Sequence, residues 1–185
     1  VRPHSPEESS NNKITDKSVF LVSGGAKGVT AACIMPLAEK YNCRFILAGR
    51  APYTGSEPSW AQGVTDETEL KRKIMEAIKA EGEMPTPVIV NKRLRAIKSE
   101  REISKTLKQI EAAGGQAEYI SADVTNSDAL KEQSAPAIEK LGNITGLIHG
   151  AGVLADKPIN KKTESDFDMV LNTKIDGLEA MLSLV

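Results

Sequence analysis

A run of apolar residues that leads into a glycine-rich turn constrains the fold of this chain more than any other feature. Residues 18–22 form the run, and the turn that follows consists of Ser23, Gly24, Gly25, Ala26, Lys27, Gly28 and Val29. An uninterrupted apolar run is typical of a parallel strand covered on both faces. Glycines after such a strand let the backbone approach a dinucleotide pyrophosphate at the start of a helix. The alternative is an ordinary tight turn, because Thr30 stands where a third glycine would be expected.

The rest of the chain alternates between strand and helix patterns. We predict strands over residues 18–22, 43–48, 116–121 and 144–149, and helices over 29–41, 99–113, 127–141 and 163–184. Pro36 is expected to kink its helix or to remove one backbone hydrogen bond, and Pro136 is expected to kink its helix. The alternation predicts an α/β fold, a Rossmann-like doubly wound parallel sheet with right-handed crossovers. We interpret residues 1–17 as a linker and residues 18–185 as one nucleotide-binding domain.

Residues 51–98 interrupt this pattern with several prolines and glycines. A connection of this length is uncommon in a compact domain, so we interpret it as an insertion after the second strand. Within it, residues 66–80 have helical periodicity and residues 87–90 are predicted to form a short strand. Ser99 is then expected to cap the helix over residues 99–113.

Unusual residues follow each predicted strand. They are the glycine-rich turn, Gly49 and Arg50, Asp123 and Val124, and Gly150, Ala151 and Gly152. Ligands of open parallel sheets bind beyond the carboxyl ends of the strands, so these residues are the candidate cofactor site. Lys27 and Arg50, with no carboxylate at the end of the second strand, favour NADP over NAD. Asp123 is expected either to bind the adenine amino group or to cap the helix over residues 127–141.

Composition excludes several other classes. The formal net charge of −1 does not favour a nucleic-acid partner. No apolar run is long enough to span a membrane, and the polar start is unlike a signal peptide. Cys33 and Cys43 have no metal-site spacing, and we expect both to be buried thiols of a cytoplasmic protein. The chain finishes on an apolar helical pattern, so we expect it to be a piece of a longer polypeptide.

Several of these stretches carry a family resemblance. SGGAKG at residues 23–28, ADV at 122–124 and HGAGV at 149–153 resemble the short-chain dehydrogenase/reductase superfamily. LIHGAGV at 147–153 followed by NTKIDGL at 172–178 is similar to the ketoreductase domain of polyketide synthases. EPSW at 57–60 and GGQAEY at 114–119 are similar to the large multidomain protein of bacterial polyunsaturated (omega-3) fatty acid synthases. The resemblance extends over almost the whole chain after Lys17.

The resemblance implies an NADPH-dependent reductase of a β-ketoacyl thioester tethered to an acyl carrier protein, within a megasynthase that has other domains. It matches Lys174 to the lysine that orients the family's catalytic tyrosine, and residues 150–152 to the nicotinamide ribose site. His149 stands where many relatives have asparagine, and we expect it to be structural. The family's catalytic Ser and Tyr lie beyond the last predicted helix, so this segment alone is expected to be inactive.

Two alternatives remain open from the sequence. One is a non-catalytic nucleotide-fold module that only supports a megasynthase. The other is a free-standing short-chain reductase of small carbonyl compounds. The glycine-rich turn, Arg50 and Lys174 argue against the first, because a purely structural module has no need of cations at a phosphate site.

Overall fold

A computed structural model describes residues 14–185 and contains a parallel sheet of four strands. The strands are β1 (Val19–Ser23), β2 (Arg44–Gly49), β3 (Gln116–Ser121) and β4 (Gly146–His149). Their order across the sheet is β3-β2-β1-β4, which confirms the predicted Rossmann-like fold class. Most of the predicted linker lies outside the described residues.

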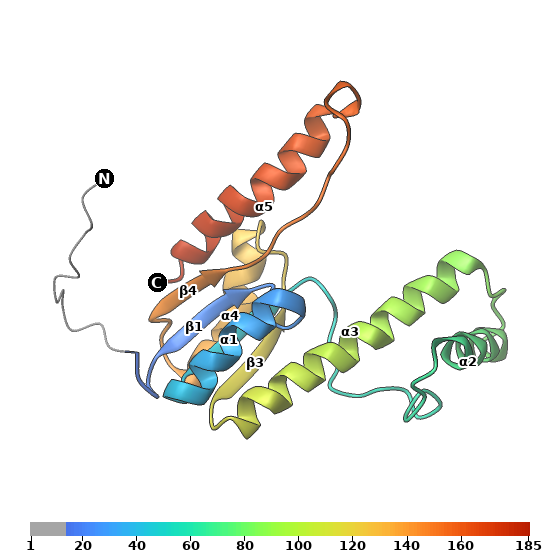
Figure 1. Cartoon of the computed structure of the whole chain (residues 1–185), viewed down its shortest axis with the longest axis horizontal. Coiled ribbons are helices and arrows are strands. Elements are labelled where there is room, and N and C mark those ends of the chain that lie inside the picture. The colour runs from blue at the N-terminus through green and yellow to red at the C-terminus, as the bar shows by residue number, and fades with distance from the viewer. Residues whose placement is uncertain (1–13) are drawn as a thin grey trace.

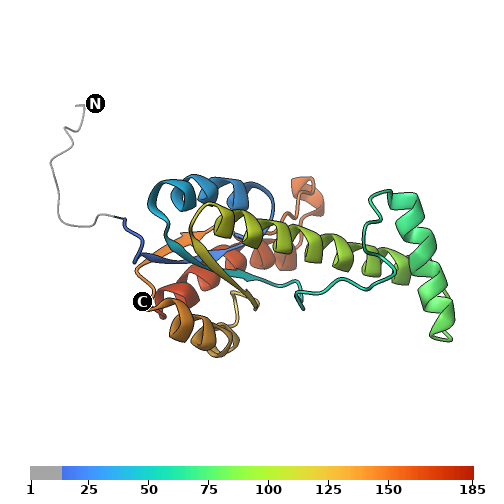
Figure 2. The same ribbon diagram turned by 90° about the horizontal axis from the view of Figure 1, so that it is seen from below.

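Helices cover both faces of the sheet (Figures 1 and 2). They are α1 (Gly28–Tyr41), α2 (Glu67–Ala80), α3 (Pro87–Ala112), α4 (Ser127–Leu141) and α5 (Glu164–Leu182), with a short 3-10 turn, η1 (Ile159–Lys161). Helix α1 and the second half of α3 bury Ile34, Ile103 and Ile110 against one face. Helices α4 and α5 bury Leu130 and Met181 against the other. Both faces of the sheet are therefore apolar, as continuous apolar strands require.

Strand register brings the carboxyl ends of the strands to one edge of the sheet. Ser23, the last residue of β1, pairs with Ala48 on one side and with His149 on the other. On the far side of β2, Gly49 pairs with Ser121. The unusual residues that follow each strand therefore start from the same edge, as the sequence predicted.

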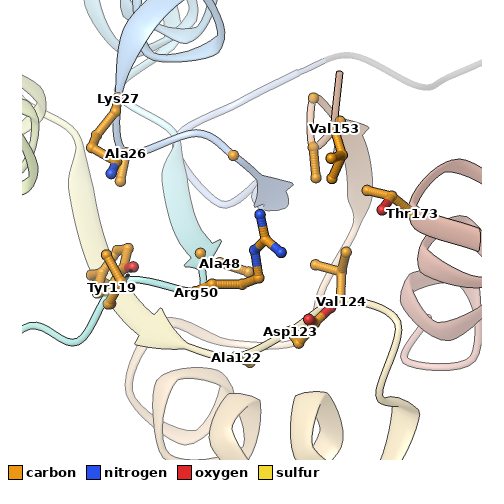
Figure 3. A pocket seen from close by; sticks show the side chains of 16 residues that line it. Ala26, Lys27, Ala48, Arg50, Tyr119, Ala122, Asp123, Val124, Val153 and Thr173 are labelled. Carbon is orange, nitrogen blue, oxygen red and sulfur yellow. Dashed lines mark hydrogen bonds between the residues drawn. The ribbon is translucent and has the colours of Figure 1, made fainter. Parts of the chain in front are cut away.

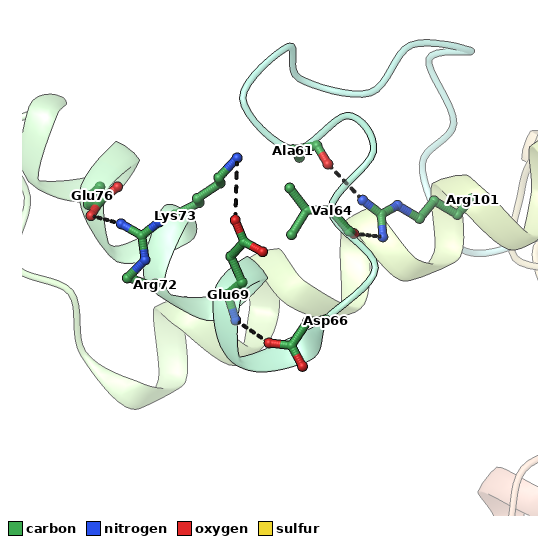
Figure 4. Close-up of polar contacts among 8 residues, drawn as sticks. All are labelled: Ala61, Val64, Asp66, Glu69, Arg72, Lys73, Glu76 and Arg101. Carbon is green, nitrogen blue, oxygen red and sulfur yellow. Dashed lines mark hydrogen bonds and ion pairs between the residues drawn. The ribbon is translucent and has the colours of Figure 1, made fainter.

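Helix α2 and the first half of α3 form an arm that extends beyond the sheet (Figure 1). The arm has an apolar cluster of its own, made by Ala61, Val64, Leu70, Ile74, Ile78, Val90, Leu94 and Ile97. Arg101 of α3 holds the loop that precedes α2 by donating to the carbonyl oxygens of Ala61 and Val64 (Figure 4). Asp66, the first residue of the predicted helical pattern, is the cap of α2 and accepts from the Glu69 amide at 2.8 Å.

The structure corrects the predicted strand over residues 87–90. These residues are the first turn of α3, which begins at Pro87 and is capped by Thr86. Pro at the first helical position loses no hydrogen bond, and the threonine side chain satisfies the Ile89 amide. Ser99 consequently lies in the middle of a long helix and does not cap one.

Further expectations are also settled by the structure. Cys43 is buried as predicted, whereas Cys33 is exposed on α1, so the prediction of two buried thiols is wrong for Cys33. Helices α1 and α4 each continue through their internal proline. Within residues 14–185, no helix is long and apolar enough to cross a membrane.

Candidate functional site

A cavity of about 350 Å³ lies at the carboxyl edge of the sheet (Figure 3). Its walls come from all four strand ends and from α5. The lining residues are Gly24, Ala26, Lys27, Ala48, Gly49, Arg50, Ala51, Tyr119, Ala122, Asp123, Val124, Gly150, Ala151, Gly152, Val153 and Thr173. Ten of the fifteen residues predicted from the sequence are in this set. Ser23, Gly25, Gly28, Val29 and Lys174 are not.

The glycine-rich turn forms one wall of the cavity, and two of its glycines have positive φ. Gly24 has a φ of +68°, and a Cβ there would lie 3.2 Å from the backbone of Gly150 and Ala151. Gly24 therefore lets β1 and β4 end close together. Gly28 has a φ of +60°, with no atom within 4 Å of a Cβ position. The positive φ therefore explains why glycine occupies position 28, because a side chain there would not clash with the sheet.

Two cations reach the cavity from neighbouring strand ends. Lys27 follows β1 and is half-buried, whereas Arg50 follows β2 and is exposed. In Figure 3 the Arg50 guanidinium lies in the middle of the labelled side chains, with Lys27 on one side and Thr173 on the other. Within the described part of the chain, neither residue takes part in an ion pair. The cavity thus presents two positive charges, and Asp123 is its only acidic lining residue.

Behind the cavity wall, a hydrogen-bonded chain joins β1, β4 and α5. His149 Nε2 lies 3.1 Å from the Thr173 carbonyl oxygen, which can only accept, so Nε2 carries the proton. Nδ1 then accepts from the Ser23 hydroxyl at 2.7 Å, and Ser23 Oγ accepts from the Ala151 amide at 3.1 Å. Burial lowers the pKa of His149, and the nearby charge of Lys174 lowers it further. This geometry is the structural role expected for His149.

The same hydrogen bonds explain why Ser23 does not line the cavity. Ser23 is fully buried, and its hydroxyl is occupied by His149 and Ala151. Gly25 is buried as well, and a Cβ there would overlap Val22. Val29 points outward from α1 and is 80% exposed. These residues shape or flank the turn without lining the cavity.

Asp123 shows which of its two expected roles the structure excludes. The cap of α4 is Asn126, whose Oδ1 accepts from the Ala129 amide at 3.0 Å. Asp123 Oδ1 instead accepts from the amide of Thr125 at 3.0 Å and from its hydroxyl at 2.9 Å. These bonds close the turn after β3 and keep the carboxylate at the cavity. Of the two roles expected for Asp123, the structure excludes the helix cap.

Tyr119 is a lining residue that the sequence did not identify. Its hydroxyl donates to the Ala51 carbonyl oxygen at 2.7 Å, and burial raises the pKa of Tyr119 to about 12. A Cβ on Gly49 would lie 2.9 Å from the same hydroxyl, so glycine there makes room for the tyrosine. Because Tyr119 approaches from the neighbouring strand, no local sequence signal indicates this contact.

Thr173 and Lys174 place α5 beside the end of β4. A Cβ on Gly177 would lie 3.1 Å from the His149 ring, so Gly177 allows α5 to approach closely. A Cβ on Gly152 would lie 3.6 Å from Lys174 Nζ, which puts the ammonium next to the cavity although Lys174 does not line it. Thr173 does line the cavity, although it was not among the residues predicted from the sequence. Its position next to Lys174 in the sequence could have indicated it.

Comparison with known proteins identifies the family of this chain. The model of the KR domain family matches residues 18–185. A polyunsaturated fatty acid synthase protein of Thraustochytrium sp. is 33% identical over the whole of this chain, which spans 7% of that protein. Polyketide synthase PksM of Bacillus subtilis is 24% identical over 92% of this chain, which spans 3% of that protein.

Solved structures show the same fold. An N-terminal ketoreductase from the macrolactin assembly line superposes with a TM-score of 0.62 at 21% identity, covering 96% of this chain and 27% of the other. Other structures of this fold are dehydrogenases solved with bound NAD or NADP. The chain therefore belongs to the KR domain family, and its relatives include polyketide and polyunsaturated fatty acid synthases.

Proposed function

We propose that this domain binds NADPH in the cavity at the carboxyl edge of the sheet and serves the reduction of a β-ketoacyl thioester to the β-hydroxyacyl form. The acyl group would be carried by an acyl carrier protein, and other domains of the same megasynthase would be its neighbours. The observation that carries the cofactor choice is the pair Lys27 and Arg50 on one cavity, without an ion-pair partner among residues 14–185.

The residues present fit the nucleotide. Gly28 has open space around its Cβ position, and the first amides of α1 follow it, so this turn suits a pyrophosphate. Lys27 and Arg50 would pair with the 2′-phosphate, which carries the charge that NAD lacks. Asp123 would accept a hydrogen bond from the adenine amino group. Residues 150–152 would line the nicotinamide ribose.

NADPH supplies the hydride when it is bound, and the protein supplies orientation and a proton. Lys174, whose ammonium lies beside Gly152, would orient the catalytic tyrosine of the family from the nicotinamide side. No tyrosine of the described chain occupies that position: Tyr119 is engaged with Ala51, and Tyr41 and Tyr53 pack on the α1 and α3 side. We therefore expect these 185 residues to bind the cofactor without turning over substrate.

Titration of NADPH into the protein, followed by nicotinamide fluorescence, tests the proposal. Saturable binding is expected, with weaker binding of NADH. Absence of binding by a sample whose circular dichroism shows it to be folded would favour a non-catalytic structural module. Consumption of NADPH with a β-ketoacyl thioester by these residues alone would contradict the assignment of the missing proton donor.

A further inference from the structure

Helix α3 contacts the glycine-rich turn at Lys27, one of the two cations that line the cavity. Lys27 Nζ donates a hydrogen bond to Ser99 Oγ at 2.8 Å, although the two residues are 72 positions apart. Both side chains are half-buried. Ser99 is not a cavity residue, so it can influence a ligand there only through Lys27.

A second contact holds α3 against the glycine-rich turn. The hydroxyl of Thr106, which is 6% exposed, lies 2.8 Å from the carbonyl oxygen of Ala26 and donates to it. Ser99 and Thr106 are seven positions apart, and residues two helical turns apart share a face. Ile103 lies between them and is fully buried. Ser99 is therefore presented to Lys27 by a helix whose position is set in the core.

The hydrogen bond to Ser99 leaves the Lys27 ammonium able to bind an anion in the cavity. An ammonium has three donors, and the bond to Ser99 occupies one of them. Two donors remain for an anion, and Lys27 still lines the cavity together with Arg50. A lysine that is already held loses less conformational freedom when it binds a phosphate than a free one does.

We propose that Ser99 is a positioning residue for cofactor selectivity, which holds Lys27 where its ammonium and Arg50 can receive the 2′-phosphate of NADPH. The inference rests on the nucleotide-binding function proposed above. It makes the arm that contains the first half of α3 part of cofactor recognition, since the same helix carries Ser99.

The test compares dissociation constants of NADPH and NADH for the unmodified protein, Ser99→Ala, Ser99→Thr and Ser104→Ala. Ser104 is a half-buried serine of the same helix that lies away from the cavity, so its variant is the matched control. Ser99→Ala should weaken NADPH roughly three- to tenfold and NADH less than about twofold, because only the charged contact is affected. Ser99→Thr keeps the hydroxyl and should retain most of the NADPH affinity of the unmodified protein.

The Lys27→Met background separates positioning from a general structural effect. In that background Ser99→Ala should change NADPH affinity by less than about twofold, since its partner is gone. Unchanged NADPH affinity in Ser99→Ala, equal losses for both cofactors, or tighter NADPH binding would each overturn the inference while leaving the proposed function in place. Failure of the unmodified protein to bind either cofactor would overturn both.

Discussion

Thr30 occupies the space that a side chain on Gly150 would need. A Cβ on Gly150 would lie 2.5 Å from Thr30 Cγ2 and 2.9 Å from Thr30 Cβ. Position 30, where a glycine was expected, therefore carries a threonine whose side chain fills the space that Gly150 leaves open. Threonine in the first turn of α1 is compatible with close packing because the opposing strand end carries glycine.

This pairing predicts that Gly150→Ala destabilises the domain and that Thr30→Gly relieves the effect. Overpacking at such a contact costs about 1–3 kcal/mol of unfolding free energy. Thr30→Gly alone loses helix propensity, worth at most about 1 kcal/mol. A double-mutant cycle measured by urea unfolding should give a coupling energy of at least about 1 kcal/mol.

Gly152→Ala is the matched control for this cycle. A Cβ there would meet only Lys174 at 3.5 Å, which is an ordinary contact, so stability should change by less than about 0.5 kcal/mol. Additive effects of Gly150→Ala and Thr30→Gly would show that the two residues do not compensate for one another.

A charge reversal at Arg50 tests the cofactor assignment directly. Arg50→Glu should weaken NADPH binding by about 10- to 100-fold, because it replaces a phosphate partner by a repelling charge. NADH has no 2′-phosphate and should change far less. Fluorescence titration of both nucleotides measures the difference. Arg95→Glu makes the same change of net charge on an exposed position of α3 and should leave both affinities unaltered.

The carboxyl edge of the sheet was the most predictable part of the site. Parallel strands end together, so residues such as Arg50, Asp123 and Gly150 could be assigned to one place from their positions after apolar runs. Strand β3 and helix α4 have the predicted bounds. Local signals sufficed there, because the apolar pattern of each segment matches the element that it forms.

Contacts between distant segments were not predictable in the same way. The start of α3 was missed because Val88, Ile89 and Val90 have high strand propensity, whereas the Thr86 cap and the packing of Val90 against α2 favour a helix. Tyr119 reaches the cavity from a neighbouring strand, and Ser99 contacts Lys27 from another helix. Their roles follow from tertiary placement, which neither residue's neighbours in the sequence encode.

Protonation of His149 should destabilise the domain at mildly acidic pH. Burial lowers the His149 pKa below its ordinary value of 6.5, so the folded protein holds the neutral ring while the unfolded chain takes up a proton at higher pH. Uptake of protons by the unfolded state favours unfolding, so this contribution to stability is complete above pH 6.5 and is lost as the pH falls below it.

Comparison with His149→Asn isolates this contribution. Urea unfolding between about pH 7.5 and 5.5 should show a steeper loss of stability for the unmodified protein than for the variant. Asparagine does not titrate, and His4, the other histidine of the chain, is common to both proteins. Parallel pH profiles would mean that the His149 pKa is the same in the folded and unfolded states.

Arg101 provides the last test, because one guanidinium fastens the loop that precedes α2. Its Nη1 donates to the Val64 carbonyl oxygen at 2.7 Å, its Nη2 donates to that of Ala61 at 2.9 Å, and Glu57 pairs with the same group. Lysine cannot reach three acceptors at fixed angles. Arg101→Lys should therefore lower the free energy of opening this loop by about 1–3 kcal/mol.

Amide hydrogen exchange locates that opening. The Ala61 and Val64 amides donate within the loop, to the carbonyl oxygens of Pro58 and Ala61, and should exchange faster in Arg101→Lys. Amides of β1 lie in the central sheet and should keep their protection, because the arm has a separate apolar cluster. Arg95→Lys, on the same helix and exposed, should change neither set. Faster exchange in β1 as well would show that the arm and the sheet unfold as one cooperative unit.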